Sequence, residues 1–104
     1  MRDLQSMVAQ TADRLGLHAT APTMLLGLMT DVGRLADEAL AGTSFGRRPF
    51  RPNDAWAQRL ADLAFTLVNL ADQTDVDLES ALRGALARYQ ASITARPPAD
   101  DLPF

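Results

Sequence analysis

The stretch "DAWAQRLADLAFTLVNLADQ", from Asp54 to Gln73, decides the fold class of this chain. Its apolar residues recur three and four positions apart, which is the repeat of an amphipathic helix. The apolar arc consists of Trp56, Leu60, Leu63, Ala64, Leu67, Val68, Leu70 and Ala71. The remaining polar stripe consists of Arg59, Asp62, Thr66, Asn69 and Gln73. A helix with so wide an apolar arc is expected to lie at the centre of a helical protein.

Three more segments show the same repeat on either side of this one. They lie next to residues that start or stop helices, such as Gly16, Pro22 and Gly42. No alternating apolar pattern is long enough to predict a strand. The sequence therefore predicts an all-α, four-helix bundle over residues 1–96 and a flexible tail at 97–104. The predicted helices cover about 3–15, 22–41, 54–73 and 77–95.

The lengths of the connections predict which helices are neighbours. Only short connections separate the first helix from the second and the third from the fourth, so we expect each of these pairs to be antiparallel. The apolar arcs of the second and third helices are wider than one small bundle can cover. We therefore expect a homodimer or a higher oligomer that buries the surplus apolar surface.

Composition limits the class of protein. With 104 residues, of which 47% are hydrophobic and 22% charged, the chain has the balance of one soluble globular domain. Its formal charge of -3 is too small to favour duplex nucleic acid or an anionic membrane as a partner. The absence of cysteine excludes disulfides, thiolate metal sites and cysteine nucleophiles. Because no apolar run is long enough for a signal peptide or a membrane span, we expect a cytoplasmic protein.

A second stretch, "LMTDVGRLADEAL" from Leu28 to Leu40, raises the question of function. Read as a helix, it has one apolar side that suits a core. On another side Asp31, Arg34 and Glu38 follow one another at spacings of three and four. This charged side is a working site, a disabled site or an ordinary solvated surface.

Two motifs carry a resemblance to a known family. "TDVGRLADEAL", from Thr30 to Leu40, resembles the Glu-Glu-x-x-Glu helix of the MazG-like, all-α nucleotide pyrophosphohydrolase superfamily. "QRLADLAFTLVNLADQTDVDLESAL", from Gln58 to Leu82, is similar to the Glu-x-x-Asp helix of the same family and to the turn that follows it. The similarity extends over roughly residues 4–90. It implies the helical fold of a family that binds Mg²⁺ through these acids and converts nucleoside triphosphates to monophosphates and pyrophosphate.

The family's five acids do not all have an acidic counterpart in this chain. Carried over by position, they fall on Thr30, Asp31, Arg34, Arg59 and Asp62. Mg²⁺ requires several convergent oxygen ligands. The two remaining acids and the two arginines have charges that cancel, so a divalent cation gains little attraction there. Asp31 and Asp62 are therefore residual metal positions, and the resemblance implies weak Mg²⁺ binding.

On this interpretation the chain is a non-catalytic family member with no expected cofactor. Asp31 opposite Arg59, and Arg34 opposite Asp62, are expected to form two ion pairs between the helices. The same arginines would also suit a phosphate. The chain is then expected to bind a nucleotide or to act through protein contacts.

The alternative is an active nucleoside triphosphate pyrophosphohydrolase that depends on Mg²⁺. Such an enzyme would need a displaced metal site built from Asp37, Glu38 or Asp54, or a site completed by another chain. Whether the chain is an enzyme therefore stays open on the sequence alone.

Several other residues have both a functional and a structural interpretation. Arg47 and Arg48, in the connection "FGRRPFRP", would suit a phosphate or a base, but such loops are more often solvated. Trp56 and Asn69 would suit ligand contacts, although a tryptophan on an apolar arc and an asparagine between helices are more often structural. His18 has no second histidine or cysteine for a metal site and is expected to be exposed or to cap a helix.

Overall fold

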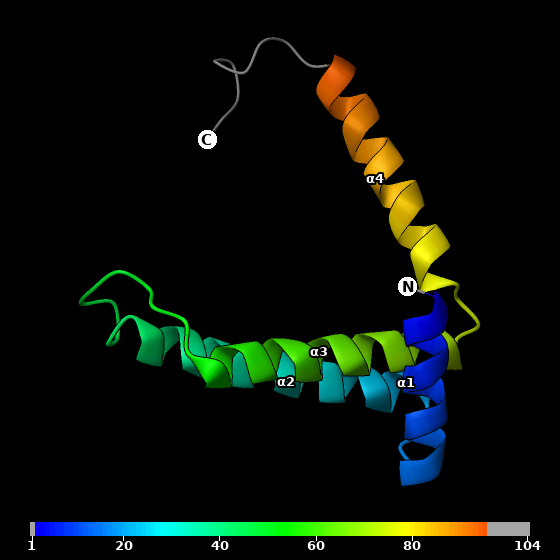
Figure 1. The fold of residues 1–104 in the computed structure, drawn as a ribbon, viewed down its shortest axis with the longest axis horizontal. Coiled ribbons are helices and arrows are strands. Elements are labelled where there is room, and N and C mark those ends of the chain that lie inside the picture. The colour runs from blue at the N-terminus through cyan, green and yellow to red at the C-terminus, as the bar shows by residue number, and fades with distance from the viewer. Residues whose placement is uncertain (1, 96–104) are drawn as a thin grey trace.

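The computed structural model describes residues 2–95, and this part of the chain forms four helices and no strand (Figure 1). The helices are α1 (Arg2–Leu15), α2 (Ala21–Gly42), α3 (Asp54–Gln73) and α4 (Leu78–Ala95). Their bounds differ from the predicted ones by about one residue at most, within the usual uncertainty of helix ends. The all-α class and its four helices are therefore confirmed. The predicted tail at 97–104 lies outside the described residues.

Local sequence signals set the helix ends. Thr20 precedes α2, and its side-chain oxygen accepts a hydrogen bond from the amide of Thr23. Asn53 has the same role before α3, where it accepts from the amide of Trp56 at 3.0 Å. Gly16 follows α1 with a φ of 66°, a conformation that glycine adopts without a side-chain clash. The polar residues and glycine that punctuate the sequence therefore act as helix caps.

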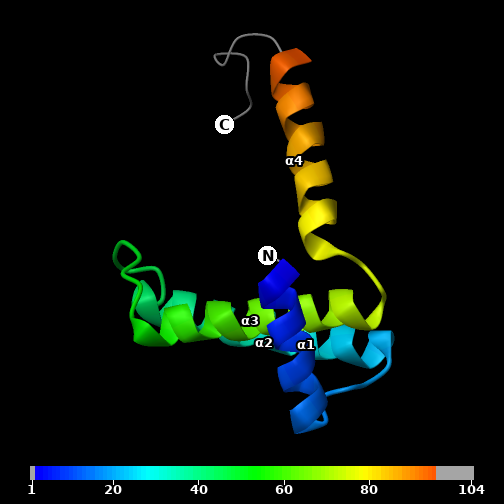
Figure 2. The ribbon, with the colours of Figure 1, turned by 45° about the vertical axis from the view of Figure 1, so that its right-hand side comes forward.

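The helices do not pair in the order that the connection lengths predicted. α2 and α3 form an antiparallel pair, joined by the long connection 43–53 (Figures 1 and 2). α1 packs across α3 rather than along α2, and α4 starts beside α1 and then extends away from the other helices (Figure 2). The predicted antiparallel pairs were therefore wrong. A short connection limits the distance between two helix ends, but the packed side chains set the angle between the helices.

The buried core is small. Among the described residues, Ala12 of α1, Met24 of α2, and Val68 and Ala71 of α3 are the buried apolar residues. Small side chains on α1 and α3 allow these two helices to approach closely. Leu67, expected on the buried arc of α3, is instead 44% exposed. The single chain therefore covers only part of the apolar arc that the sequence places on α3.

Candidate functional site

The predicted acidic site lies between α2 and α3, and one hydrogen bond joins its two sides. The hydroxyl of Thr66 on α3 donates to the carboxylate of Asp31 on α2, with an oxygen-to-oxygen distance of 2.6 Å. The Asp31 side chain is only 13% exposed, so this charge-assisted bond is largely shielded from water. Thr66 had no predicted role at this site. The available signal was its place on the polar stripe of α3, one turn after Asp62.

Each arginine at this site pairs with an acid on its own helix. An Arg34 guanidinium nitrogen lies 4.0 Å from an Asp31 carboxylate oxygen, and Arg59 lies 3.8 Å from Asp62 in the same way. The predicted ion pairs between the helices were therefore wrong. Residues three apart on one helix are already neighbours, so the pairs form without crossing between helices. The site keeps the predicted balance of charge, because each acid has an arginine beside it.

The residues present do not fit a Mg²⁺ site within one chain. Mg²⁺ needs near-octahedral oxygen coordination. Within residues 2–95, no group of three or more acidic or histidine side chains lies close enough together to hold a metal ion. Asp37, Glu38 and Asp54 are therefore not part of any such group in this part of the chain. A guanidinium beside each retained acid also opposes the approach of a cation.

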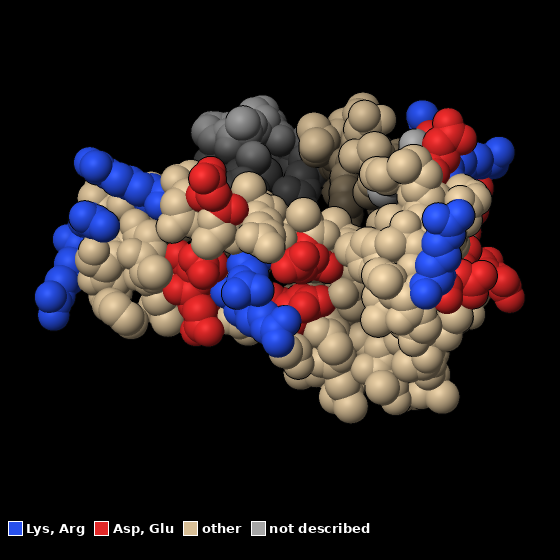
Figure 3. Space-filling view, turned by 60° about the horizontal axis from the view of Figure 1, so that its bottom comes forward, with Lys and Arg blue, Asp and Glu red and all other residues tan. Residues whose placement is uncertain are grey.

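The charged side chains on this surface alternate in sign. Figure 3 shows acidic and basic side chains next to one another near the middle of one face, rather than an acidic patch. Arg34 and Asp62 are 56% and 48% exposed. Solvent-exposed ion pairs contribute little to stability, so these contacts adjust the local charge more than they hold the helices together.

The other end of the polar stripe on α3 binds the α1–α2 connection. The Asn69 amide nitrogen donates to the carbonyl of Leu17 at 3.2 Å, and Asn69 is only 4% exposed. His18 contacts Asp13 through one ring nitrogen and Gln73 through the other. With both ring nitrogens engaged, His18 has a structural role. Asn69 makes the structural contact considered for it, and its buried side-chain oxygen has no hydrogen-bond partner among residues 2–95.

Phe50 of the α2–α3 connection packs against Trp56 of α3, whereas Phe45 of the same connection is 77% exposed. The Phe50 and Trp56 rings meet edge to face, with centroids 4.8 Å apart and an angle of 70° between the planes. Trp56 thus has a packing partner within the chain. Arg47 and Arg48 are exposed in the connection, and Figure 3 shows basic side chains gathered at one end of the molecule.

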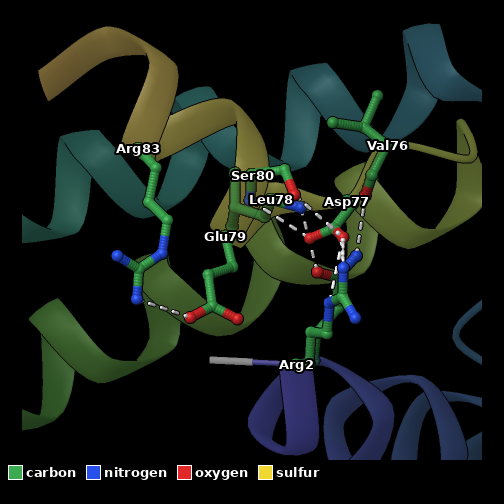
Figure 4. Close-up of polar contacts among 8 residues, drawn as sticks. Arg2, Val76, Asp77, Leu78, Glu79, Ser80 and Arg83 are labelled. Atoms are coloured by element: carbon green, nitrogen blue, oxygen red, sulfur yellow. Dashed lines mark hydrogen bonds and ion pairs between the residues drawn. The ribbon is translucent and has the colours of Figure 1, made fainter. Parts of the chain in front are cut away.

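A cluster of polar contacts, not foreseen from the sequence, fixes the start of α4 to α1. The Gln5 side chain donates to the carbonyl of Val76 at 2.8 Å and accepts from the amide of Leu78 at 3.1 Å. Arg2 forms an ion pair with Asp77 at 3.1 Å (Figure 4). These contacts join residues more than seventy positions apart, so periodicity within one helix could not reveal them. They fix the direction in which α4 leaves the other helices.

Asp77 also caps α4. Its carboxylate accepts hydrogen bonds from the backbone amide and the hydroxyl of Ser80, at 3.2 and 3.1 Å (Figure 4). The backbone bond from Ser80, together with the Ser80 hydroxyl and Arg2, lowers the pKa of Asp77 below its ordinary value. A hydrogen bond from Arg83 to Glu79 lowers the pKa of Glu79. The first turn of α4 therefore favours ionised carboxylates.

Comparison with known proteins gave no match to a family model, a curated protein or a solved structure. Among the helices of residues 2–95, none combines the length and the apolar character needed to cross a membrane.

Proposed function

We propose that this chain is a non-catalytic, MazG-like helical module that acts in the cytoplasm through protein contacts. The pairing of Asp31 with Arg34, and of Asp62 with Arg59, is the observation that carries the non-catalytic part. It cancels the charge at the positions where the resembling pyrophosphohydrolases hold Mg²⁺. Without a concentrated negative charge, neither metal binding nor metal-assisted attack on a phosphate is favoured.

Exposed apolar side chains support the protein-contact part of the proposal. Leu26 and Met29 on α2, and Tyr89 and Ile93 on α4, are each at least 65% exposed. Monomeric soluble proteins rarely leave extended apolar patches open, and larger patches mark interaction surfaces. The contacts proposed first are with other copies of the same chain, in a homodimer or a higher oligomer. Neither a membrane nor duplex nucleic acid is proposed as a partner.

An assay for pyrophosphate release tests the non-catalytic part. The purified chain is incubated with Mg²⁺ and a panel of nucleoside triphosphates, with a known pyrophosphohydrolase as the control for detection. We expect no release above the rate without protein. Metal-dependent turnover would overturn the proposal and restore the active-enzyme alternative.

Two binding measurements on the same preparation test the protein-contact part. Calorimetric titration with the same nucleotides should give no saturable binding, and sedimentation should give a mass above that of one chain. Nucleotide binding without turnover would keep the module non-catalytic but would assign it a nucleotide as its ligand. A monomer at every concentration would contradict self-association.

A further inference from the structure

Helix α4 carries an apolar stripe that is largely exposed in the part of the chain that the structure describes. The stripe consists of Leu82, Leu86, Tyr89 and Ile93, whose spacings of four, three and four place them on one side of the helix. Their exposed fractions are 50%, 50%, 65% and 68%. Such spacing is typical of a helix that packs lengthwise against another helical surface. In Figures 1 and 2, α4 extends away from the α2–α3 pair, so α1, α2 and α3 do not lie along it.

A second uncovered apolar feature lies between α1 and α3. A groove there is almost entirely apolar at its surface, and its walls consist of Leu4, Val8, Ala61, Ala64, Phe65 and Val68. Small alanines on the α3 side leave room for a larger side chain to enter. Leu4 at the edge of this groove is 54% exposed. The groove thus offers an apolar surface where α4 of the same chain does not lie.

The contacts at the start of α4 hold this helix in a direction that leads away from its own groove. Gln5 and Arg2 of α1 hold residues 76–78, and Asp77 caps the first turn of α4. Asp75, in the turn before α4, has a φ of 58°. A non-glycine residue in the left-handed region fixes a tight turn. The outward direction of α4 is therefore built into the α3–α4 turn and its contacts with α1.

The total exposed area fits what a dimer buries. The chain exposes 7839 Å², whereas a folded monomer of 11.3 kDa exposes about 5,700 Å². Met1 and residues 96–104 can be assigned the full surface of an unfolded chain, and residues 2–95 can then be compared with a folded monomer of their own mass. The exposed area still exceeds the expected area by about 900 Å². Each partner in a standard interface buries about 800 Å².

We propose that two copies of this chain exchange their α4 helices, with the α4 stripe of each copy lying in the α1–α3 groove of the other. This inference rests on the self-association proposed above and specifies its geometry. In a two-fold dimer this contact occurs twice, so the α4 stripe and the α1–α3 groove of each copy are both covered. Pairing of α4 with α4 would cover the stripes but would leave both grooves open.

Charge substitutions on α4 test whether the stripe is the contact. Leu86→Arg places a charge on the stripe, and Ala91→Arg places the same charge on the opposite, exposed side of the same helix. Sedimentation over a range of concentrations should show Leu86→Arg weakening the dimer by at least about thirtyfold. Ala91→Arg should leave the dissociation constant within about threefold of the original chain, a free-energy change typical of a surface substitution. Circular dichroism confirms that both variants keep their helices.

Cross-linking tests whether the partner surface is the groove. Because the chain has no native cysteine, Leu86→Cys on the stripe and Ala64→Cys in the groove each introduce a single thiol. A short thiol-specific cross-linker should join the two variants when they are mixed and allowed to exchange subunits. Each variant alone should give much less product.

The outcomes distinguish a failure of the helix exchange from a failure of the self-association on which it rests. A monomeric original chain would overturn self-association and the helix exchange with it. A dimer that survives Leu86→Arg would keep self-association but would overturn the exchange of α4. Efficient cross-linking of Leu86→Cys alone would overturn the groove as the partner surface and would assign an α4–α4 contact. The pyrophosphate assay is independent of all three outcomes.

Discussion

A hydrogen bond from a hydroxyl to a carboxylate, rather than an ion pair, links the polar faces of α2 and α3. The Thr66 hydroxyl reaches the Asp31 carboxylate directly. A short side chain loses little conformational entropy when it is fixed, whereas the long arginines keep more freedom by pairing on their own helix near solvent. The buried polar link therefore comes from a neutral hydroxyl, and the charges balance separately on each helix.

Gly42, the last residue of α2, shows a second constraint at the scale of one residue. A methyl group added there would lie 2.7 and 2.8 Å from ring carbons of Phe50 and 3.1 Å from the carbonyl of Arg51. The Phe50 ring already packs against Trp56, so it has little room to move. Gly33, in the same helix, has no heavy atom within 4 Å of the corresponding position.

Alanine substitutions at these two glycines should have opposite effects on stability. Gly42→Ala should lower the free energy of unfolding by about 1 to 3 kcal/mol, because the added methyl group overpacks against Phe50. Gly33→Ala should raise it by about 0.4 to 1 kcal/mol, because alanine restricts the unfolded chain and favours helix. Urea unfolding monitored by circular dichroism measures both values. A Gly42→Ala variant as stable as the Gly33→Ala variant would show that Phe50 does not pack on α2.

At the scale of elements, α4 depends on contacts with α1 rather than on a core of its own. Asp77 is the centre of this junction, because it caps α4 through Ser80 and pairs with Arg2. Gln5 adds two hydrogen bonds to the backbone on either side of Asp77. Asp72 also lines the hollow between α1 and this turn. A change in the charge of Asp77 should therefore affect the position of the whole helix.

Acid should weaken the attachment of α4. The pKa of Asp77 is lower in the folded chain than in the unfolded chain, so its contribution to stability is present above the unfolded pKa of about 4. That contribution is lost as the pH falls through the lowered value. The hydrogen-exchange protection of the first amides of α4, taken relative to the intrinsic exchange rate at each pH, should fall on acidification below pH about 4. Asp77→Asn should show a smaller change of protection with pH, and an equal loss of protection in both proteins would contradict the role given to Asp77.

At the scale of the whole molecule, the sequence predicted the elements better than their arrangement. The three-and-four repeat and the caps at Thr20 and Asn53 depend only on nearby residues, so the helix bounds followed from them. The crossing of α1 over α3 and the direction of α4 depend on contacts such as Gln5 with Leu78, which lie far apart in sequence. The width of an apolar arc also cannot reveal which of its residues the same chain covers: Leu67 lies on the predicted arc of α3 but is 44% exposed, and it is not among the residues that line the α1–α3 groove.

The candidate site was predicted in its composition but not in its pairing. The positions of Asp31, Arg34, Arg59 and Asp62 implied a balance of charge, and the structure gives each acid an arginine neighbour. A spacing of three along one helix allows the pairs that the structure shows. Whether an arginine instead reaches the acid on the other helix depends on the separation of the two helices, which spacing along one helix does not reveal. If the proposed relationship to the pyrophosphohydrolases holds, the most direct consequence of the cancelled charge is weak binding of Mg²⁺ at this site.

Restoring the acids should restore affinity for Mg²⁺ if charge cancellation is the reason for its loss. The double variant Arg34→Glu with Arg59→Glu places glutamates at two of the family's acidic positions. Each new pair of like charges should cost about 0.2 to 0.5 kcal/mol of stability, which circular dichroism can show to be tolerated. The variant should bind Mg²⁺ at least about tenfold more tightly than the original chain, because the cation then meets four acids and no arginine.

Calorimetric titration of Mg²⁺ into the original chain and into this double variant is the most direct test of the central claim. We expect no saturable heat from the original chain and saturable binding by the variant. Mg²⁺ binding by the original chain that is as tight as binding by the variant would contradict the claim that arginines have cancelled the acidic site.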